Sequence, residues 1–260
     1  GDPAWSPDSR WLAFTEAAPN TFSQVKLFDA ASGEVTTLTS DRVNAQTPAW
    51  DAKGDFLWFL SDRRLVSSVQ SPWGSRQPEP FFDKTWEIYE IGLRSDVRSH
   101  FRPADELMPS ADAAAAAATP APARITLDGI QRRVRRVPVE AGNYGALSAN
   151  GSALFYLSRD AGQFGGGSLV ALPITADDPK PVVMAEGVSG YELSGDGKKL
   201  LLRQRDALYV VDAKAAKPGN LQDGKVDLSG WKFSMDVRQD FRQMFLDALR
   251  MEEDYFYDPG

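Results

Sequence analysis

The stretch Trp5-Ser-Pro-Asp-Ser-Arg-Trp-Leu-Ala-Phe14 joins an extended residue, a tight polar turn and an apolar strand. Proline suits the second position of such a turn, and the serine and aspartate side chains can bond to the nearby backbone. In the apolar part, the side chains of Leu12 and Phe14 point to one face of a strand, and their neighbours point to the other. The stretch therefore predicts two consecutive strands of an antiparallel sheet.

The same pattern returns three times further along the chain. Its copies are Trp50-Asp-Ala-Lys-Gly-Asp-Phe-Leu-Trp-Phe-Leu60, Leu147-Ser-Ala-Asn-Gly-Ser-Ala-Leu-Phe-Tyr-Leu157 and Leu193-Ser-Gly-Asp-Gly-Lys-Lys-Leu-Leu-Leu202. The first two copies start 45 residues apart, and the last two start 46 residues apart. A repeat of roughly 40–45 residues is the period of a four-stranded propeller blade, as in WD40-like repeats. The middle interval of 97 residues predicts one blade with a large insertion.

We therefore predict an all-β fold of four β-propeller blades, each a four-stranded antiparallel sheet, over residues 1–45, 46–142, 143–188 and 189–230. The second blade carries an insertion at residues 94–124, where prolines surround the alanine run 113–118. Such a short alanine run does not persist as a helix in water, so we expect a mobile surface loop. Residues 130–139 are predicted to return as the missing outer strand. Because closed propellers contain about 4 to 8 blades, four could form a small complete ring.

Beyond Trp231 the hydrophobic period changes to that of a helix. Asp236 suits the N-cap position, with Gln239 three residues on, as in a capping box. The apolar residues that follow at helical spacing are Val237, Phe241, Met244, Phe245, Ala248 and Leu249. We expect residues 231–260 to hold one amphipathic helix of a truncated further domain. Both ends, Gly1-Asp2-Pro3 and Asp258-Pro259-Gly260, look cut, so we expect an excised piece of a longer protein.

The composition argues against several classes of protein. A net charge of −7 and a pI near 4.9 argue against nucleic-acid binding, which needs a basic surface. No apolar run approaches the roughly 20 residues that a membrane-spanning helix needs. The absence of cysteine excludes disulfides, cysteine–zinc sites and thiol nucleophiles. It also fits a reducing compartment, so the cytoplasm is the expected location and the periplasm is the alternative.

Three segments resemble the tricorn-type serine peptidases. The segment from Gly129 to Tyr144 is similar to the strand pair at a blade junction of their second, seven-bladed propeller. The run from Tyr191 to Leu202 is similar to the last full blade of that propeller. Residues 231–259, with Met-Asp-Val-Arg-Gln-Asp-Phe-Arg-Gln-Met-Phe and Asp-Tyr-Phe-Tyr-Asp-Pro, are similar to the helix that opens the peptidase core. The resemblance covers most of the chain after about residue 125, and its third segment is the most specific. It implies that the four blades are part of a seven-bladed propeller whose other blades lie upstream.

This resemblance implies serine acyl transfer for the whole enzyme, in which a serine attacks, a histidine accepts its proton and backbone amides hold the oxyanion. The family's propellers do no chemistry and act as filters through which peptides reach or leave an enclosed site. No catalytic residue of the family maps onto this chain, so we expect no catalytic residue, cofactor or metal site here. The expected partners are the remainder of the same polypeptide, peptides and further copies in a homo-oligomer, with no nucleic acid and no membrane.

Two other kinds of propeller protein stay open. A TolB-like non-enzymatic propeller that binds protein partners explains the blade motifs, but not the helix after Trp231. The propeller of a prolyl-oligopeptidase-like enzyme would be followed by an α/β-hydrolase domain with a Gly-x-Ser-x-Gly elbow. The reading frame beyond residue 260 would discriminate among the three, because each predicts a different continuation.

Several local features suggest chemistry, and each has a plainer explanation. His100 is the single histidine, but no nucleophile elbow accompanies it, so we expect a surface-loop role. The run Gln163-Phe-Gly-Gly-Gly-Ser168 lacks the Lys-Ser/Thr of a phosphate loop, so we expect a flexible hairpin loop. Asp8-Ser9 and Asp196-Gly197 lack the spaced carboxylates of a calcium loop, so we expect simple turns.

The basic run Arg132, Arg133, Arg135 and Arg136 is the candidate substrate-binding cluster. On a strand, Arg133 and Arg135 would point one way and the other two arginines the opposite way. The plainer explanation is a charged outer strand that discourages edge-to-edge pairing. The functional alternative is contact with an acidic partner segment or with a peptide's C-terminal carboxylate. Large aromatic residues are expected to pack between blades rather than to form a ligand cage; they are Trp5, Trp11, Trp50, Trp58, Trp86 and Trp231.

Overall fold

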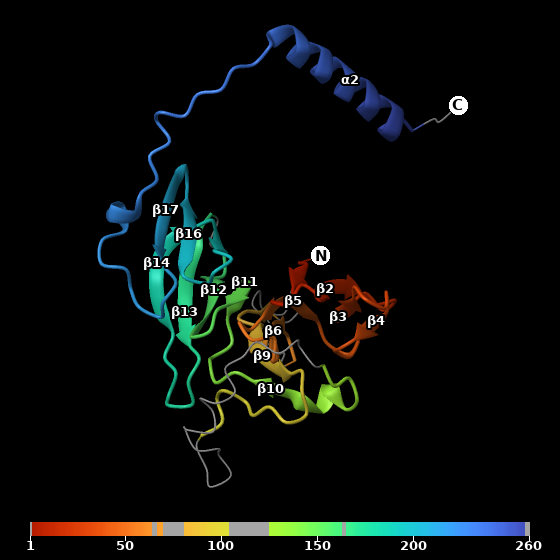
Figure 1. The fold of residues 1–260 in the computed structure, drawn as a ribbon, viewed down its shortest axis with the longest axis vertical. Coiled ribbons are helices and arrows are strands. Elements are labelled where there is room, and N and C mark those ends of the chain that lie inside the picture. The colour runs from red at the N-terminus through yellow and green to blue at the C-terminus, as the bar shows by residue number, and fades with distance from the viewer. Residues whose placement is uncertain (1, 64–66, 70–80, 104–124, 163–164, 258–260) are drawn as a thin grey trace. The chain divides into compact units, whose positions relative to one another are not determined.

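The structure, a computed structural model, describes residues 2–63, 67–69, 81–103, 125–162 and 165–257. The chain divides into two units, Gly1–Val226 and Asp227–Gly260. The first unit is built of antiparallel sheets, and the second contains one helix (Figure 1). The predicted all-β fold followed by a single amphipathic helix is therefore confirmed.

Three of the sheets have four strands each, and every strand pairs with its neighbours in chain order. The first contains β1 (Ala4–Trp5), β2 (Trp11–Ala17), β3 (Ser23–Asp29) and β4 (Val35–Thr37). The second contains β5 (Ala45–Trp50), β6 (Phe56–Ser61), β9 (Glu87–Gly92) and β10 (Val134–Arg136). The third contains β11 (Asn143–Ala149), β12 (Ala153–Arg159), β13 (Gly167–Pro173) and β14 (Val182–Val188). This chain-order meander is the arrangement of propeller blades.

The fourth sheet differs from the prediction in its outer strand. Its strands are β15 (Gly190–Leu193), β16 (Lys199–Gln204) and β17 (Ala207–Asp212). In place of the fourth strand predicted for this blade, the described chain forms a short 3-10 helix, η3 (Leu221–Gly224), and a bridge between Tyr209 and Lys225. At Gly224, a Cβ would lie 2.2 Å from the carbonyl oxygen of Val210. The chain therefore approaches β17 so closely that only glycine fits there.

The outer strand of the second blade is also shorter than predicted. Residues Ile130–Arg133 form a 3-10 helix, η2, which follows Gly129 in the left-handed region at φ 63°. Only β10 then pairs with β9, with Val134 opposite Ile91. A short hairpin, β7 (Ser67–Val69) and β8 (Phe81–Phe82), falls between β6 and β9, and the sequence analysis did not foresee it. The alanine run and its predicted mobility lie outside the described residues.

Apolar side chains gather in three clusters, each shared by two consecutive sheets. The first and second sheets meet at Trp11, Leu27, Trp50, Leu57 and Ile91 among others. The second and third meet at Trp58, Leu60, Ile88, Leu154 and Tyr156 among others. The third and fourth meet at Phe155, Leu169, Met184, Leu200 and Leu202 among others. Because the second sheet has a cluster on each side, every residue of β6 and β9 is buried.

The tryptophans divide between core and surface. Trp11, Trp50 and Trp58 are buried in the clusters, as predicted, and Trp86 packs partly buried against the second one. Trp5 and Trp231 are 55% and 76% exposed, so the prediction of inter-blade packing was wrong for these two. A tryptophan on an inner strand need not face a neighbouring sheet, because side chains on a strand alternate between its faces.

The second unit holds helix α2 (Val237–Tyr255). Its N-cap is Asp236, as predicted, whose carboxylate accepts the backbone N–H groups of Arg238 and Gln239 at 2.9 and 3.3 Å. The helix is amphipathic, and none of its residues is buried. Within the described residues, no helix combines the length and apolar character that crossing a membrane requires.

Candidate functional site

A polar residue ends the inner strand of each sheet and caps the start of the next strand. Ser6 Oγ accepts the N–H of Trp11 at 2.9 Å, and Asp51 Oδ1 accepts the N–H of Phe56 at 2.8 Å. Asn150 Oδ1 accepts the N–H of Ala153 at 2.9 Å, and Ser194 Oγ accepts the N–H of Lys199 at 2.9 Å. These side chains compete locally for backbone groups, as Ser, Asp and Asn do in turns. The repeat in the sequence therefore corresponds to one structural feature, a hydrogen bond from the backbone of the second strand to the polar side chain that follows the inner strand of each sheet.

The third copy of this turn is shorter than the others. The N–H of Asn150 bonds to the carbonyl of Ala153, three residues on, whereas that of Ser6 bonds to Trp11, five residues on. The structural equivalent of Trp5 is therefore Ala149, the residue before Asn150, and not Leu147. The sequence pattern matched the apolar Leu147 to Trp5, which is two residues too early, because it aligned apolar residues and not the capping side chains Ser6 and Asn150.

The four inner strands and their turns line a cavity of about 1120 Å³. The walls from the first two sheets are mainly apolar, with Pro3, Trp5, Pro48 and Trp50, and the half-exposed indole of Trp5 is their largest group. The remaining walls come from the turns after β11 and β15 and from the end of β17. They carry polar and charged groups, namely Ser148, Asn150, Ser152, Ser194, Asp196, Lys198, Lys199, Asp212 and Lys214.

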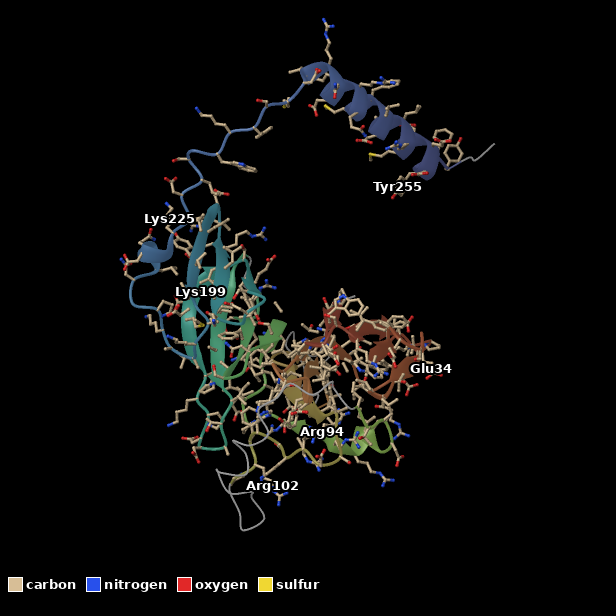
Figure 2. All side chains as sticks on the ribbon, viewed as in Figure 1. Glu34, Arg94, Arg102, Lys199, Lys225 and Tyr255 are labelled. Carbon is tan, nitrogen blue, oxygen red and sulfur yellow. The ribbon has the colours of Figure 1, made fainter. Side chains whose placement is uncertain are left out.

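The charges of the fourth sheet are paired with one another. Lys199, labelled in Figure 2, places Nζ 2.7 Å from Asp212 Oδ1, and Lys214 Nζ lies 3.3 Å from the other oxygen. These two bonds, that from Lys199 above all, hold the pKa of Asp212 below its usual value. The Ser194 hydroxyl likewise lowers the pKa of Asp196, with a smaller contribution from Lys198. This wall therefore offers both signs of charge to a ligand without a large net charge.

Asp51 has the opposite character. Asp51 lines the cavity but is only 7% exposed. Burial raises the pKa of its carboxyl, although the hydrogen bonds that it accepts from the backbone N–H groups of Phe56 and Lys53 lower that pKa in part. A carboxylate held by two backbone N–H groups at the end of β5 fixes the turn geometry. The sequence pattern predicted a turn here and no special role for Asp51, although a polar residue at this position in all four turns was a usable signal.

Hydrogen bonds between sheets fix the relative positions of the cavity walls. Trp50 Nε1 donates to the carbonyl oxygen of Ala4 at 2.8 Å, which joins the first two sheets. Asn150 Nδ2 donates to Gly197 and Ala213 carbonyl oxygens at 2.8 and 2.9 Å, which joins the last two. These bonds are buried or partly buried, where a lost partner is costly.

A further bond between the last two sheets comes from Tyr191 of β15. Its hydroxyl lies 2.9 Å from Ser148 Oγ and 2.7 Å from the Phe155 carbonyl oxygen. Burial raises the pKa of this phenol, so it stays a neutral donor over the working range of most proteins. Together with Asn150, Tyr191 holds the third and fourth cavity walls in one register.

The arginine cluster lies apart from the cavity lining. Arg133 donates to the carbonyl oxygens of Gly92 and Asp128, both at 2.8 Å, and so closes the loop before β10. Arg136 Nη1 pairs with Glu87, a carboxylate only 2% exposed, at 2.9 Å. Arg132 and Arg135 are exposed. The prediction of one alternating strand is wrong for Arg132 and Arg133, which belong to η2; peptide binding by the cluster stays a prediction.

His100 is not a free loop residue. Its ring lies 4.3 Å from that of Phe56 and 5.4 Å from that of Trp58, between centroids, and Nδ1 is 3.6 Å from Glu90 Oε2. His100 lies in a loop, as expected, and its side chain is one-third exposed, but residues 94–103, the start of the predicted insertion, pack through Val97 and Phe101 on the cluster between the second and third sheets. Within the described part of the chain, no hydroxyl or thiol is placed with it as a nucleophile.

The remaining sequence features are turns. Asp8 accepts the Ser6 hydroxyl at 2.5 Å and the Arg10 N–H at 3.2 Å, and Asp196 repeats this arrangement with Ser194 and Lys198. The described residues contain no group of three His, Cys, Asp or Glu side chains that could hold a metal ion. Of the glycine run, Gln163 and Phe164 lie outside the described residues, and Gly167 begins β13.

Comparison with known proteins assigns the chain to a family. The family model of the tricorn protease second beta propeller domain matches residues 1–214. The chain belongs to this family. Tricorn protease homolog 1 of Streptomyces coelicolor is 26% identical over 274 residues, covering 97% of this chain and 25% of the relative. The tricorn protease of Thermoplasma volcanium is 22% identical over 274 residues, covering 99% of this chain and 25% of the relative.

The structural comparison agrees. The crystal structure of the tricorn protease matches 99% of this chain and 25% of its own chain, with a TM-score of 0.76 at 17% identity. This likeness confirms the propeller fold, and the family match confirms the resemblance read from the sequence. The chain spans between 23% and 29% of the length of the curated tricorn relatives it matches.

Proposed function

We propose that this chain is the non-catalytic propeller portion of a tricorn-like serine peptidase, and that its cavity guides peptides between solvent and an active site outside the chain. The observation that carries the proposal is the cavity of about 1120 Å³ formed by the inner strands and turns of all four sheets, in a chain of the tricorn second propeller family. Pockets for small molecules hold roughly 300–1,000 Å³, so this cavity has room for a short peptide segment.

The chemistry of the walls supports passage rather than tight selection. The half-exposed indole of Trp5 offers a flat apolar surface, and the lysines and aspartates of the fourth sheet are already paired with one another. A peptide can therefore contact the walls through its backbone and through apolar or charged side chains without leaving a buried charge unpaired. Weak contacts of several kinds suit a path that must also release what it binds.

The wider assignment follows from the same family relation. We place the propeller portion at residues 1–230 and the start of the peptidase core at residues 231–260, where α2 presents an amphipathic surface. The remainder of the same polypeptide is then the first partner, peptides are the ligands and a homo-oligomer is the assembled form. The proposed location is the cytoplasm, with the periplasm as the alternative.

A single introduced cysteine tests the proposal, because the chain contains none of its own. We would label Ala52→Cys, in the exposed part of the cavity lining, with an environment-sensitive fluorophore and titrate a ten-residue peptide. The matched control is Ala31→Cys, which is equally exposed in the β3–β4 turn. A saturable change at position 52 alone supports the proposal. Equal responses at both positions, or none at either, would contradict it.

A blocking variant gives a second, independent arm. Gly195 lines the cavity, and a Cβ added there meets nothing within 4 Å, so we choose Gly195→Trp to place a large side chain at the cavity wall. We expect it to weaken peptide binding at least tenfold. Gly219→Trp, at another open glycine outside this lining, should leave binding unchanged.

A further inference from the structure

The packing of residues 94–103 onto the second sheet contains an unusual buried carboxylate. Glu90 of β9 is 1% exposed, and neither of its side-chain oxygens has a hydrogen-bond partner within the described residues. The indole Nε1 of Trp58, on the neighbouring strand and paired with Glu90 in the ladder, is also buried without a partner there. Burying an ionised carboxylate in such a place is strongly unfavourable unless a positive charge lies close to it.

Among the described residues, the basic side chain that lies beside Glu90 is His100, which carries a positive charge when its ring is protonated. Its Nδ1 lies 3.6 Å from Glu90 Oε2 and has no other partner in the described chain. The ring is held in place by Phe56 and Trp58, and the next residue, Phe101, meets Trp58 edge-on with centroids 5.9 Å apart. The contact between His100 and Glu90 is thus part of a packed aromatic group that covers the second sheet.

Acidic groups from two elements interact with this imidazole, and a third acidic group nearby in the fold pairs with an arginine. Glu90 comes from β9, and Asp51, which follows β5, also interacts with the charge on His100. Asp55, in the turn before β6, pairs at 3.2 Å with Arg94, labelled in Figure 2. Within the 94–103 segment itself, Arg94 also binds Asp96, and Arg98 donates to the carbonyl oxygen of Pro103. Arg94 and Arg98 thus each bind another group, and the imidazole interacts with two acidic groups, Glu90 and Asp51.

We infer that His100 is a pH-sensitive clasp. As an imidazolium it fastens residues 94–103 over the boundary between the second and third sheets through Glu90, and as a neutral imidazole it lets this segment loosen. Histidine changes charge between pH 5 and 8. On the acid side of that range, a positive ring faces the buried carboxylate. On the alkaline side the carboxylate is left uncompensated, so docking of the segment weakens as the pH rises.

Hydrogen exchange in the full 260-residue chain tests the clasp. We expect the protection of amides in residues 94–103, corrected for the intrinsic pH dependence of exchange, to fall about tenfold from pH 5.5 to 8, the ratio expected of a partly buried ion pair. Glu90→Gln keeps the shape of the side chain and removes its charge, so protection should become equal at the two pH values. His100→Gln should give weak protection at both.

A matched control separates the clasp from general loosening. Asp96→Asn removes the pairing with Arg94 within the same segment, so it should lower protection at both pH values and keep the tenfold ratio. The proton NMR signals of the single imidazole provide a second readout. They should be displaced by the rings of Phe56 and Trp58 at pH 5.5, relative to a Ser-His-Phe-Arg-Pro peptide at the same pH, and much less at pH 8.

Two outcomes would overturn the inference. One is a wild-type segment whose protection does not change between pH 5.5 and 8. The other is a Glu90→Gln variant that keeps the wild-type ratio, which would mean that another group is titrating. If Glu90→Gln does not fold, the inference is tested by comparing the pH dependence of protection in the wild-type chain and in His100→Gln, together with the NMR signals of the imidazole. His100 is one-third exposed, so its replacement should be tolerated better than that of buried Glu90.

Discussion

The indole Nε1 of Trp50 donates a 2.8 Å hydrogen bond to the carbonyl oxygen of Ala4, which joins the inner strand of the second sheet to that of the first. Both residues line the cavity, so this bond fixes the distance between two of its walls. Comparable bonds from Asn150 join the third and fourth sheets. The cavity is thus held by specific polar contacts between sheets as well as by the apolar clusters beneath it.

Replacing Trp50 by Phe should lower the free energy of unfolding by about 2–4 kcal/mol, because the hydrogen bond is lost and the smaller ring leaves a gap. Trp58→Phe is the control, since Trp58 is also buried but its Nε1 has no partner within the described chain. Urea denaturation should show a loss at position 50 that is about 1 kcal/mol larger. Equal losses would mean that the bond to Ala4 contributes nothing.

Asn150→Asp should destabilise the chain by about 2–4 kcal/mol near neutral pH. The amide nitrogen that now donates to the Gly197 and Ala213 carbonyls would become a carboxylate oxygen facing them. Protonation of the new carboxyl restores one donor, so part of the loss should disappear at acid pH. Thermal melts between pH 4 and 7 measure this, and a loss independent of pH would show that packing dominates.

The ion pair of Arg10 and Asp29 stabilises the first sheet near neutral pH, and this stabilisation is lost in acid. Two bonds from Arg10, at 3.2 and 3.0 Å, and one from the Ala31 N–H lower the pKa of Asp29 from 3.8 to about 2. A carboxyl whose pKa is lowered by folding stabilises the folded state at any pH above its pKa in the unfolded chain. This contribution is lost as the pH falls from about 4 to 2.

The variant Asp29→Asn should therefore show a smaller fall in melting temperature over that interval than the wild-type chain. Asp178→Asn is the control, because Asp178 forms its ion pair with Lys180 at a position where both side chains are more than three-quarters exposed. That variant should follow the wild-type curve. If Asp29→Asn also follows it, the bonds from Arg10 do not govern acid stability.

Arg136 should matter for stability and Arg132 should not. Arg136→Gln removes the charge that pairs with buried Glu87, which then keeps only the hydroxyl of Tyr89, at 2.7 Å. We expect a loss of about 1–3 kcal/mol, reduced by the partial exposure of Arg136. Arg132→Gln, on the exposed surface of η2, should change stability by less than about 0.5 kcal/mol.

The outer faces of the first and last sheets should promote self-association. In β2 and β3, Trp11 and Leu27 are buried while Phe28 on the opposite face is only partly covered, and in β17 Val210 is 40% exposed. Sheet faces of this kind normally pack against another layer. Sedimentation should detect concentration-dependent oligomers that the double variant Phe28→Lys, Val210→Lys reduces. A wild-type chain that stays monomeric at high concentration would contradict this.

The sequence by itself determined the four main sheets, their order and the helix that follows. These features depend on local patterns: a polar turn after each inner strand, alternation along β2 or β16, and Asp236 before a run with helical spacing. Each is decided by neighbours within a few residues, so no knowledge of distant contacts was needed. The outer strands of the second and fourth sheets were mispredicted because Gly129 and Gly224 meet backbone constraints that hydrophobic patterns do not reveal.

Only the tertiary structure decided what the shared turns do together. It brought Asp51, Asn150 and Lys199, which are up to 148 residues apart in the sequence, to one cavity. It also placed His100, which the sequence assigned to a surface loop, beside the buried carboxylate of Glu90. The physical reason is that burial and charge pairing depend on side chains that meet across sheets. The pattern of residues along the chain does not show which side chains of different sheets come into contact.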